Sequence, residues 1–165
     1  MKKNVFLSVL LFVVLFGCSK NGTSTDEIVA LKELENLEES KKWALMTGKW
    51  YGNQPTKSGG RREHITDRYA DGTYKITYRI YENTGALKEG AEVGYWGVSG
   101  PIYFSIFKGW LKDGKVTPAL SSNPYNYDAY LIIILNDKEF KYKHLSSGNV
   151  YTLIRVDSEY QLGSK

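Results

Sequence analysis

The pattern of apolar and polar residues changes at Gly48, with helical spacing before it and alternation after it. From there on, short runs rich in Tyr, Ile, Val, Phe and Trp are separated by turn residues such as Asp71-Gly72. Alternating runs bounded by turn residues are typical of half-buried β-strands. The pattern predicts eight strands, at Thr47–Gln54, Arg61–Tyr69, Thr73–Glu82, Ala91–Val98, Ile102–Trp110, Ala129–Leu135, Glu139–Leu145 and Val150–Val156.

Eight consecutive strands joined by hairpins can close into a barrel, because an even number lets the first and last strands pair antiparallel. The expected fold is all-β, an eight-stranded antiparallel up-and-down barrel over residues 47–158. Its even-numbered connections are three residues each, and the odd-numbered ones are longer. We therefore expect one tightly turned end and one open end with the long loops, and ligand sites in barrels favour such a mouth. The long connections are Pro55–Gly60, Asn83–Gly90, Leu111–Asp128 and Ser146–Asn149.

Before the strands, leucine and isoleucine recur at helical spacing with Glu and Lys between them. Ser24 and Glu27 match a capping box at the start of this stretch. The pattern predicts one N-terminal helix over 26–46, ended by Gly48, that enters the first strand at the tight end and acts there as a lid. Its apolar positions are Ile28, Leu31, Leu34, Leu37 and Leu45.

The first 17 residues have the features of a secretory signal. A positive start precedes an apolar run from Val5 to Phe16, which is shorter than the roughly 20 residues that a membrane-spanning helix needs. The sequence Leu-Phe-Gly-Cys at 15–18 resembles the lipobox of bacterial lipoproteins. The resemblance implies cleavage after residue 17, lipid attachment to Cys18 and a tether over 18–25. An ordinary signal peptide with an incidental cysteine is the alternative.

The same resemblance implies a location. Ser19, and not the aspartate associated with inner-membrane retention, follows the cysteine. A lipid-anchored protein of the cell envelope is therefore expected, with the membrane as its partner through Cys18. In a Gram-negative cell the expected location is the outer membrane, facing the periplasm.

Composition excludes several other classes. The formal net charge is +4, and part of it leaves with the signal, so nucleic acid is not an expected partner. The chain has 1 Cys and 2 His, which argues against a disulfide framework and against a Cys- or His-built metal site. We expect no cofactor and no metal. Neither histidine belongs to a catalytic motif, and Gly-x-Ser-x-Gly is absent, so we do not expect an enzyme.

Two segments at the ends of the predicted barrel resemble a known family. Gly48-Lys49-Trp50, directly after a helix, is similar to the Gly-x-Trp signature of lipocalins. Arg155 in the last strand matches the arginine that packs across that tryptophan in the family. The resemblance implies a lipocalin-like barrel with Gly48, Trp50 and Arg155 as its structural floor.

The more apolar register of each strand is assigned to the interior. Within it, Tyr78, Trp96, Phe104, Tyr130 and Tyr142 are the expected ligand-binding walls. An eight-stranded barrel is wide enough either to be filled by its own side chains or to hold one small ligand, and both possibilities stay open. The expected inward set is Trp50, Ile76, Tyr78, Ile80, Trp96, Val98, Phe104, Ile106, Tyr130, Ile132, Tyr142 and Ile154.

The expected function is a membrane-anchored envelope lipoprotein that binds a small apolar or amphipathic molecule in the barrel. Burying about ten methylenes contributes roughly 8 kcal/mol before ~4 kcal/mol or more of lost motional freedom, so tight binding needs a polar anchor. Candidate anchors are Arg68, Arg79, Glu92 and His144. The alternative is an envelope protein-interaction or inhibitor module with a filled barrel, which would bind through its long loops and the Tyr125-Asn126-Tyr127 cluster.

Overall fold

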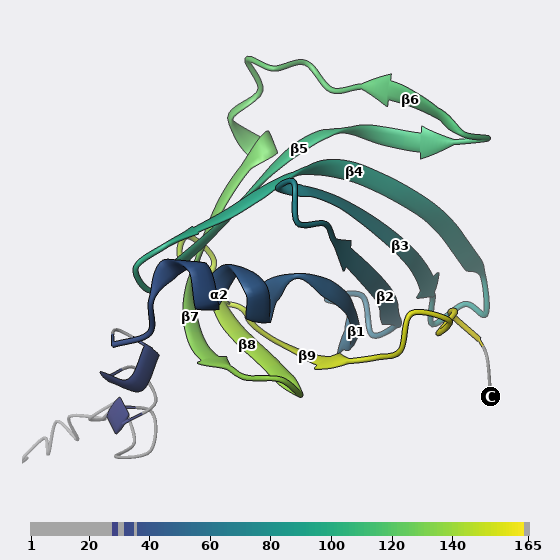
Figure 1. Cartoon of the computed structure of the whole chain (residues 1–165). Helices are drawn as coiled ribbons and strands as arrows, with labels where there is room; N and C mark the ends of the chain where they lie inside the picture. Colours follow the sequence, from purple (N-terminus) through teal and green to yellow (C-terminus); the bar gives the residue numbers. More distant parts are fainter. Residues whose placement is uncertain (1–27, 30–31, 35, 164–165) are drawn as a thin grey trace, which may run out of the picture.

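The computed structural model describes residues 28–29, 32–34 and 36–163 (Figure 1). The expected signal peptide, Cys18 and the tether lie outside these residues. The described part contains helix α2, a short 3-10 helix η1 and nine strands. Their bounds are α2 Glu39–Met46, β1 Gly48–Pro55, β2 Arg61–Arg68, β3 Thr73–Tyr81, β4 Leu87–Ser99, β5 Ile102–Lys112, β6 Lys115–Pro118, η1 Pro124–Asn126, β7 Tyr127–Leu135, β8 Glu139–His144 and β9 Val150–Arg155.

The strands form an antiparallel barrel that is closed in chain order. Each of β1 to β5 pairs with the next, β5 pairs with β7, and β7, β8 and β9 follow in turn. Closure is completed by β1 and β9, where Trp50 lies opposite Arg155. The predicted all-β, eight-stranded, up-and-down barrel is therefore confirmed, and Figure 1 shows its curved strands.

Strand β6 was not predicted and lies inside the expected loop at 111–128. It pairs only with β5, so it extends one strand of the barrel without entering its wall. Asp113 and Gly114 both have positive φ and form the two-residue turn between these strands. An Asp-Gly pair favours such a turn. The four strand residues themselves are all exposed, so they give no alternating signal.

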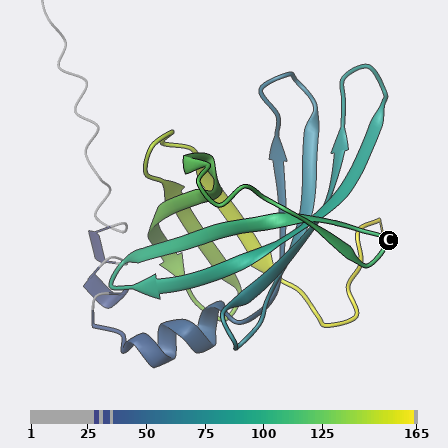
Figure 2. The same ribbon diagram turned by 90° about the horizontal axis from the view of Figure 1, so that it is seen from above.

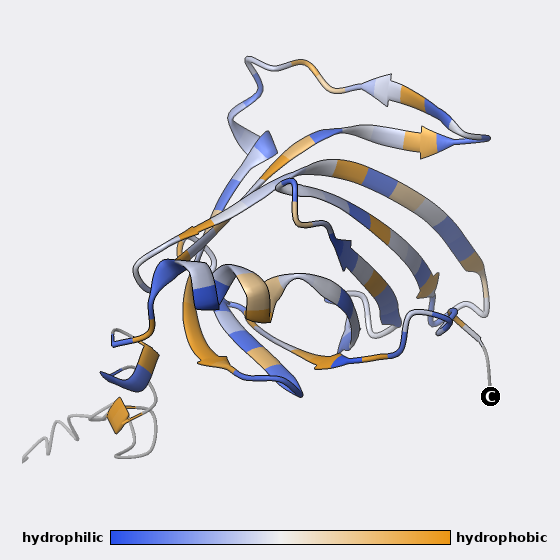
Figure 3. Ribbon diagram, in the orientation of Figure 1, coloured by the Kyte–Doolittle hydropathy of each residue, from blue (hydrophilic) through white to orange (hydrophobic). Residues whose placement is uncertain are grey.

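Polar and apolar residues alternate along the strands, as the colouring of Figure 3 shows. On β5 the predicted register was wrong by one residue, because Tyr103, Ser105 and Phe107 face inward. Phe104 is 38% exposed on the outer face, where its ring covers Gly97 of β4. An aromatic ring commonly covers a cross-strand glycine, and here this contact places the more apolar register outside.

Two further inward assignments, Ile106 and Ile154, were also wrong. Ile106 belongs with Phe104 on the outer face of β5, where it lies opposite the exposed Tyr95. On β9, Ile154 is 52% exposed while Leu153 is fully buried. Both strands carry apolar residues on each face, so counting apolar residues does not separate the two registers.

The predicted single helix over 26–46 is interrupted. Residues 36–38 are not helical, and Glu38 has an extended conformation with φ −60° and ψ 145°. The interruption lets Leu34 and Met46 pack into the same buried cluster. Twelve residues of straight helix would separate these two side chains by about 18 Å along the axis. No helix among the described residues is long and apolar enough to cross a bilayer.

Helix α2 lies across the tightly turned end of the barrel. The Trp43 indole nitrogen donates to the carbonyl of Ala70 in the β2–β3 turn at 3.1 Å. The amide of Gly100, in the β4–β5 turn, donates to the Glu39 carboxylate at 3.0 Å. In Figure 2 the helix lies at one end and the β1–β2 and β3–β4 loops extend at the other. The mouth is therefore left to the long loops.

Candidate functional site

The barrel floor is built around Trp50 and Arg155. The Arg155 guanidinium lies over the Trp50 indole, 4.3 Å from the ring centroid. It also donates to the backbone carbonyls of Thr47 at 2.9 Å, Asp137 at 2.8 Å and Leu45. The Trp50 indole nitrogen donates to the carbonyl of Met46 at 2.9 Å. One cation thus joins α2, β1 and the β7–β8 turn.

Gly48 makes that arrangement possible. Its φ is +113°, and a Cβ at this position would lie 2.7 Å from Arg155 Nη1. A side chain here would therefore be strained and would also displace the guanidinium from Trp50.

Trp96, expected in the pocket wall, belongs to the floor. It is 3% exposed, and its ring stacks on Trp43 of α2 at a centroid distance of 4.2 Å. Its indole nitrogen donates to the carbonyl of Tyr69 at 3.1 Å. The helix covers this end of the barrel, so Trp96 packs against α2 and not against the interior space.

A cavity of about 610 Å³ runs from the floor to the long loops. Tyr130 and Tyr142 lie on its wall, on the inward face that was predicted for them. Tyr78 does not line the cavity, and its ring packs against the lining residues Trp110 and Arg62. Phe104 is on the outside. The barrel is therefore not filled. Its wall also includes Gln54, His64, Thr66, Arg68, Tyr74, Ile76, Glu92, Tyr103, Ser105, Phe107, Asn126, Asp128, His144 and Tyr151.

Strand β2 makes this cavity much more polar than expected. Its residues Arg62, His64, Thr66 and Arg68 alternate along the strand, and all four line the cavity. No residue of this strand was among the predicted inward set, because both of its faces carry charged residues. The available signal was the spacing of these four polar residues at every second position.

Arg68 is buried at the deep end of the cavity with 1% of its surface exposed. Its Nη2 donates to the Tyr103 hydroxyl at 3.2 Å, and its guanidinium carbon is 4.9 Å from the ring centroids of both Tyr103 and Phe140. Nε and Nη1 are buried and have no hydrogen-bond acceptor among the described residues.

His64 lies beside this cation and stays neutral. It is 7% exposed, and burial, together with the charges of Arg62 and Arg68, lowers its pKa to about 3. Gly52, its partner on β1, leaves room for the ring, because a Cβ there would lie 2.3 Å from His64 Cε1. The imidazole therefore lines the cavity without adding charge to it.

Glu92 is a half-buried carboxyl group on the cavity wall. Burial raises its pKa, the Arg62 charge opposes that rise, and the Asp128 charge adds to it. Of the four candidate anchors, Arg68, Glu92 and His144 do line one cavity. Arg79 does not, because it forms an ion pair with Glu89 on the outer face of the sheet.

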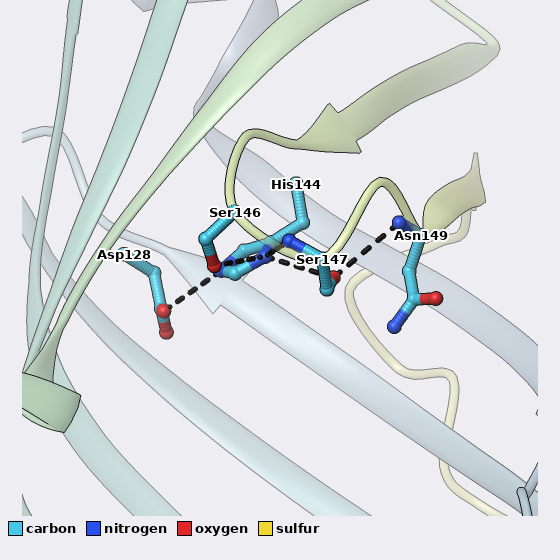
Figure 4. Close-up of polar contacts among 5 residues, drawn as sticks. All are labelled: Asp128, His144, Ser146, Ser147 and Asn149. Atoms are coloured by element: carbon cyan, nitrogen blue, oxygen red, sulfur yellow. Dashed lines mark hydrogen bonds and ion pairs between the residues drawn. The ribbon is translucent and has the colours of Figure 1, made fainter.

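At the mouth, Asp128, His144 and Ser147 form the cluster drawn in Figure 4. The Ser147 amide donates to His144 Nδ1 at 3.0 Å, so Nε2 carries the proton and donates to Asp128 Oδ1 at 3.0 Å. The Ser147 and Ser146 hydroxyls also lie 2.9 Å and 3.2 Å from Nδ1. A Ser–His–Asp relay needs a free Nδ1 or Nε2 lone pair to act as the base for the serine. Here the Ser147 backbone amide already donates to the Nδ1 lone pair of His144. The cluster instead holds the β8–β9 loop closed.

Within the described part of the chain, no group of three or more His, Cys, Asp or Glu side chains could hold a metal ion.

No family model matches the chain, and no curated protein matches it. Among solved structures, the chain is similar to a lipocalin-like protein from Bacteroides uniformis. That similarity covers 68% of this chain and 99% of the other, with 12% sequence identity and a TM-score of 0.41. The lipocalin-like fold of the chain rests on its own strand order and on the pairing of β1 with β9 that closes the barrel.

Proposed function

We propose that this protein is a lipid-anchored lipoprotein of the cell envelope whose barrel binds one small amphipathic molecule. The observation that carries the proposal is the cavity of about 610 Å³, which falls in the range of roughly 300–1,000 Å³ typical of small-molecule sites. It reaches the surface, because Tyr125 on its rim is 88% exposed. Ile76, Phe107 and Trp110 supply apolar wall, and β2 supplies polar wall.

A second candidate function is supported by the long loop over 111–128. Leu120 is 73% exposed and Tyr125 is 88% exposed. Exposed large apolar residues that lie close together often mark a protein-binding surface. In this alternative the protein is an interaction or inhibitor module of the envelope, and the loop makes the contact.

Native mass spectrometry of the protein purified from its own cell envelope distinguishes small-molecule binding from protein binding through the loop. The proposal expects an extra small-molecule mass that is released on unfolding. The absence of extra mass, together with no uptake of a panel of fluorescent fatty acids and their alcohols, would contradict small-molecule binding. The loop alternative instead expects a co-purified protein that is lost when Leu120 and Tyr125 are both changed to Ser.

The anchor is tested separately. Cys18→Ser removes the sulfur that would carry the lipid. Because several acyl chains bind a bilayer far more strongly than one, losing them should release the protein from the membrane. We expect the variant in the soluble fraction, whereas Ser19→Ala should still sediment with membranes. A Cys18→Ser variant that sediments fully would contradict the lipid anchor.

A further inference from the structure

The deep end of the cavity holds a cation that has no anionic partner among the described residues. Arg68 is 1% exposed, and none of the ion pairs among the described residues includes it. Two of its three guanidinium nitrogens, Nε and Nη1, are buried and have no acceptor in the part of the chain that the structure describes. Arg68 does not become neutral by losing a proton, because the pKa of a guanidinium is too high.

The tyrosines around the cavity do not neutralise this charge. Burial is the largest of the causes that raise the pKa values of Tyr74, Tyr130 and Tyr142 above their ordinary value. Their hydroxyls therefore stay protonated. They remain hydrogen-bond donors, which suits an anion placed among them.

The two carboxyl groups on the cavity wall interact with residues other than Arg68. Asp128 accepts a hydrogen bond from His144 Nε2 at 3.0 Å. Glu92 lies on β4, interacts with Arg62, and burial raises its pKa. Neither lies within ion-pair distance of Arg68. The aromatic faces of Tyr103 and Phe140 at 4.9 Å are partial compensation only.

A buried charge without a counter-ion is costly, at several kcal/mol per ion even after relaxation. A buried cation of this kind is retained where an anionic ligand binds to it. A guanidinium presents its N–H groups in one plane, which matches the oxygens of a carboxylate or a phosphate.

We propose that the deep end of the cavity is an oxyanion site, where Arg68 binds the carboxylate or phosphate group of a small organic ligand. This inference deepens the proposed function and rests on it. The ligand enters with its charged group first, since Arg68 ends β2 next to the floor. Its apolar body then lies against Phe107 and Trp110, which come later on β5, toward the mouth.

The length of the site sets the kind of ligand. Arg62 and Arg68 both line the cavity and are six residues apart, which is about 20 Å along the strand. Arg62 also has an unpartnered nitrogen, Nε, but its guanidinium carbon lies 4.8 Å from the ring centroid of Tyr78 and it interacts with Glu92. The deep cation is therefore the stronger anchor, and a ligand with one anionic end fits better than one with two.

The test compares two ligands of the same shape, 1-naphthoate and 1-naphthamide, which differ in charge. Binding is measured by calorimetry on the full chain in lipid nanodiscs, with empty nanodiscs as the reference. We expect the acid to bind about 10- to 100-fold more tightly than the amide, since hydrogen bonds to a charged group contribute about 1.5–3 kcal/mol.

Arg68→Met keeps the length of the side chain and removes its charge. We expect this variant to lose the preference for the acid and to bind the two ligands equally. Arg79→Met is the matched control, because Arg79 lies on the next strand but faces outward with Glu89. It should keep the full preference for the acid. Circular dichroism and urea unfolding establish that each variant is folded.

The outcomes separate this inference from the proposed function. If the acid and the amide bind wild type equally, and Arg68→Met changes neither, the oxyanion site is overturned and small-molecule binding stands. If neither ligand binds and native mass spectrometry finds no ligand, both proposals fail. Competition by inorganic phosphate in wild type, lost in Arg68→Met, supports the site and assigns phosphate as the anionic group. A preference for naphthoate without competition supports the site and assigns carboxylate.

Discussion

Trp50 and Arg155 are direct cross-strand partners at the seam where the barrel closes, and the guanidinium carbon of Arg155 lies 4.3 Å from the Trp50 ring centroid. The first and last strands of the barrel are therefore joined by a side-chain contact as well as by backbone pairing. The same guanidinium donates to three backbone carbonyls around the floor.

We expect Arg155→Ala to lower the free energy of unfolding by about 3 kcal/mol. The variant loses a cation–π contact of about 0.5–2 kcal/mol and leaves three carbonyls without their charged donor. Urea unfolding followed by tryptophan fluorescence measures the loss. Arg155→Lys keeps the charge but lacks the planar guanidinium, so its free energy of unfolding should lie between those of wild type and Arg155→Ala. Equal stability of Arg155→Ala and wild type would contradict the structural role of this floor.

Gly48→Ala should destabilise the protein by about 3 kcal/mol, because it places a side chain at φ +113° and against Arg155 Nη1. Gly85→Ala is the control, since Gly85 also has a positive φ, +84°, but no atom of the described residues lies within 4 Å of the added Cβ. It should cost about 1 kcal/mol. In the Arg155→Ala background, Gly48→Ala should cost about 1–2 kcal/mol less than in wild type, and strict additivity would show that the contact with Arg155 is not the cause.

Trp43→Ala should loosen α2 from the barrel end. The variant loses the stacking on Trp96 at 4.2 Å and the hydrogen bond to Ala70, for a cost of about 2–3 kcal/mol. Hydrogen exchange of the α2 amides should rise along with the loss of stability. Lys41→Ala, on the exposed side of the same helix, should change neither quantity. Unchanged protection of α2 in Trp43→Ala would contradict its role as a lid.

His64 should make the protein less stable as the pH falls from about 6.5 toward 3. Its pKa in the folded state is lowered to about 3 from 6.5, so the unfolded chain binds more protons across that window. Stability then rises with pH there, and the loss between pH 7 and pH 5 should be about 2 kcal/mol. Glu92, with its raised pKa, acts in the opposite direction.

The comparison with His64→Gln isolates this contribution, because Glu92 and the other carboxyl groups are the same in both proteins. The variant should lose much less stability than wild type between pH 7 and pH 5. Parallel urea midpoints over this range would show that His64 is not the titrating group.

The fold was largely predictable because turns and alternation are local features of the chain. Asp71-Gly72 and Gly100-Pro101 mark tight hairpins, and the residues between such turns alternate strongly enough to define the eight barrel strands. Strand β6 was missed because its residues are exposed on both faces. The break in the N-terminal helix was missed because it depends on where Leu34 and Met46 pack in the folded protein.

The site was predicted less well, and for a different reason. The face on which a side chain lies follows from alternation only where one face is clearly apolar. Tyr130 and Tyr142 were placed on the cavity side, but Phe104 points outward to cover Gly97. Arg68 is a candidate anchor that the sequence does not orient, because β2 carries charge on both faces. Only the strand pairing of the whole barrel decides which face of β2 lies inside.

The chemical character of the cavity thus depends on the alignment of a single strand. Arg62, His64, Thr66 and Arg68 point inward, while Glu63, Ile65 and Asp67 alternate with them on the other side. Sliding β2 by one position would exchange these two sets and replace two arginines on the cavity wall with two carboxylates. The β1–β2 pairing, in which Gly52 leaves room for His64, therefore selects which charges of β2 face a molecule in the barrel.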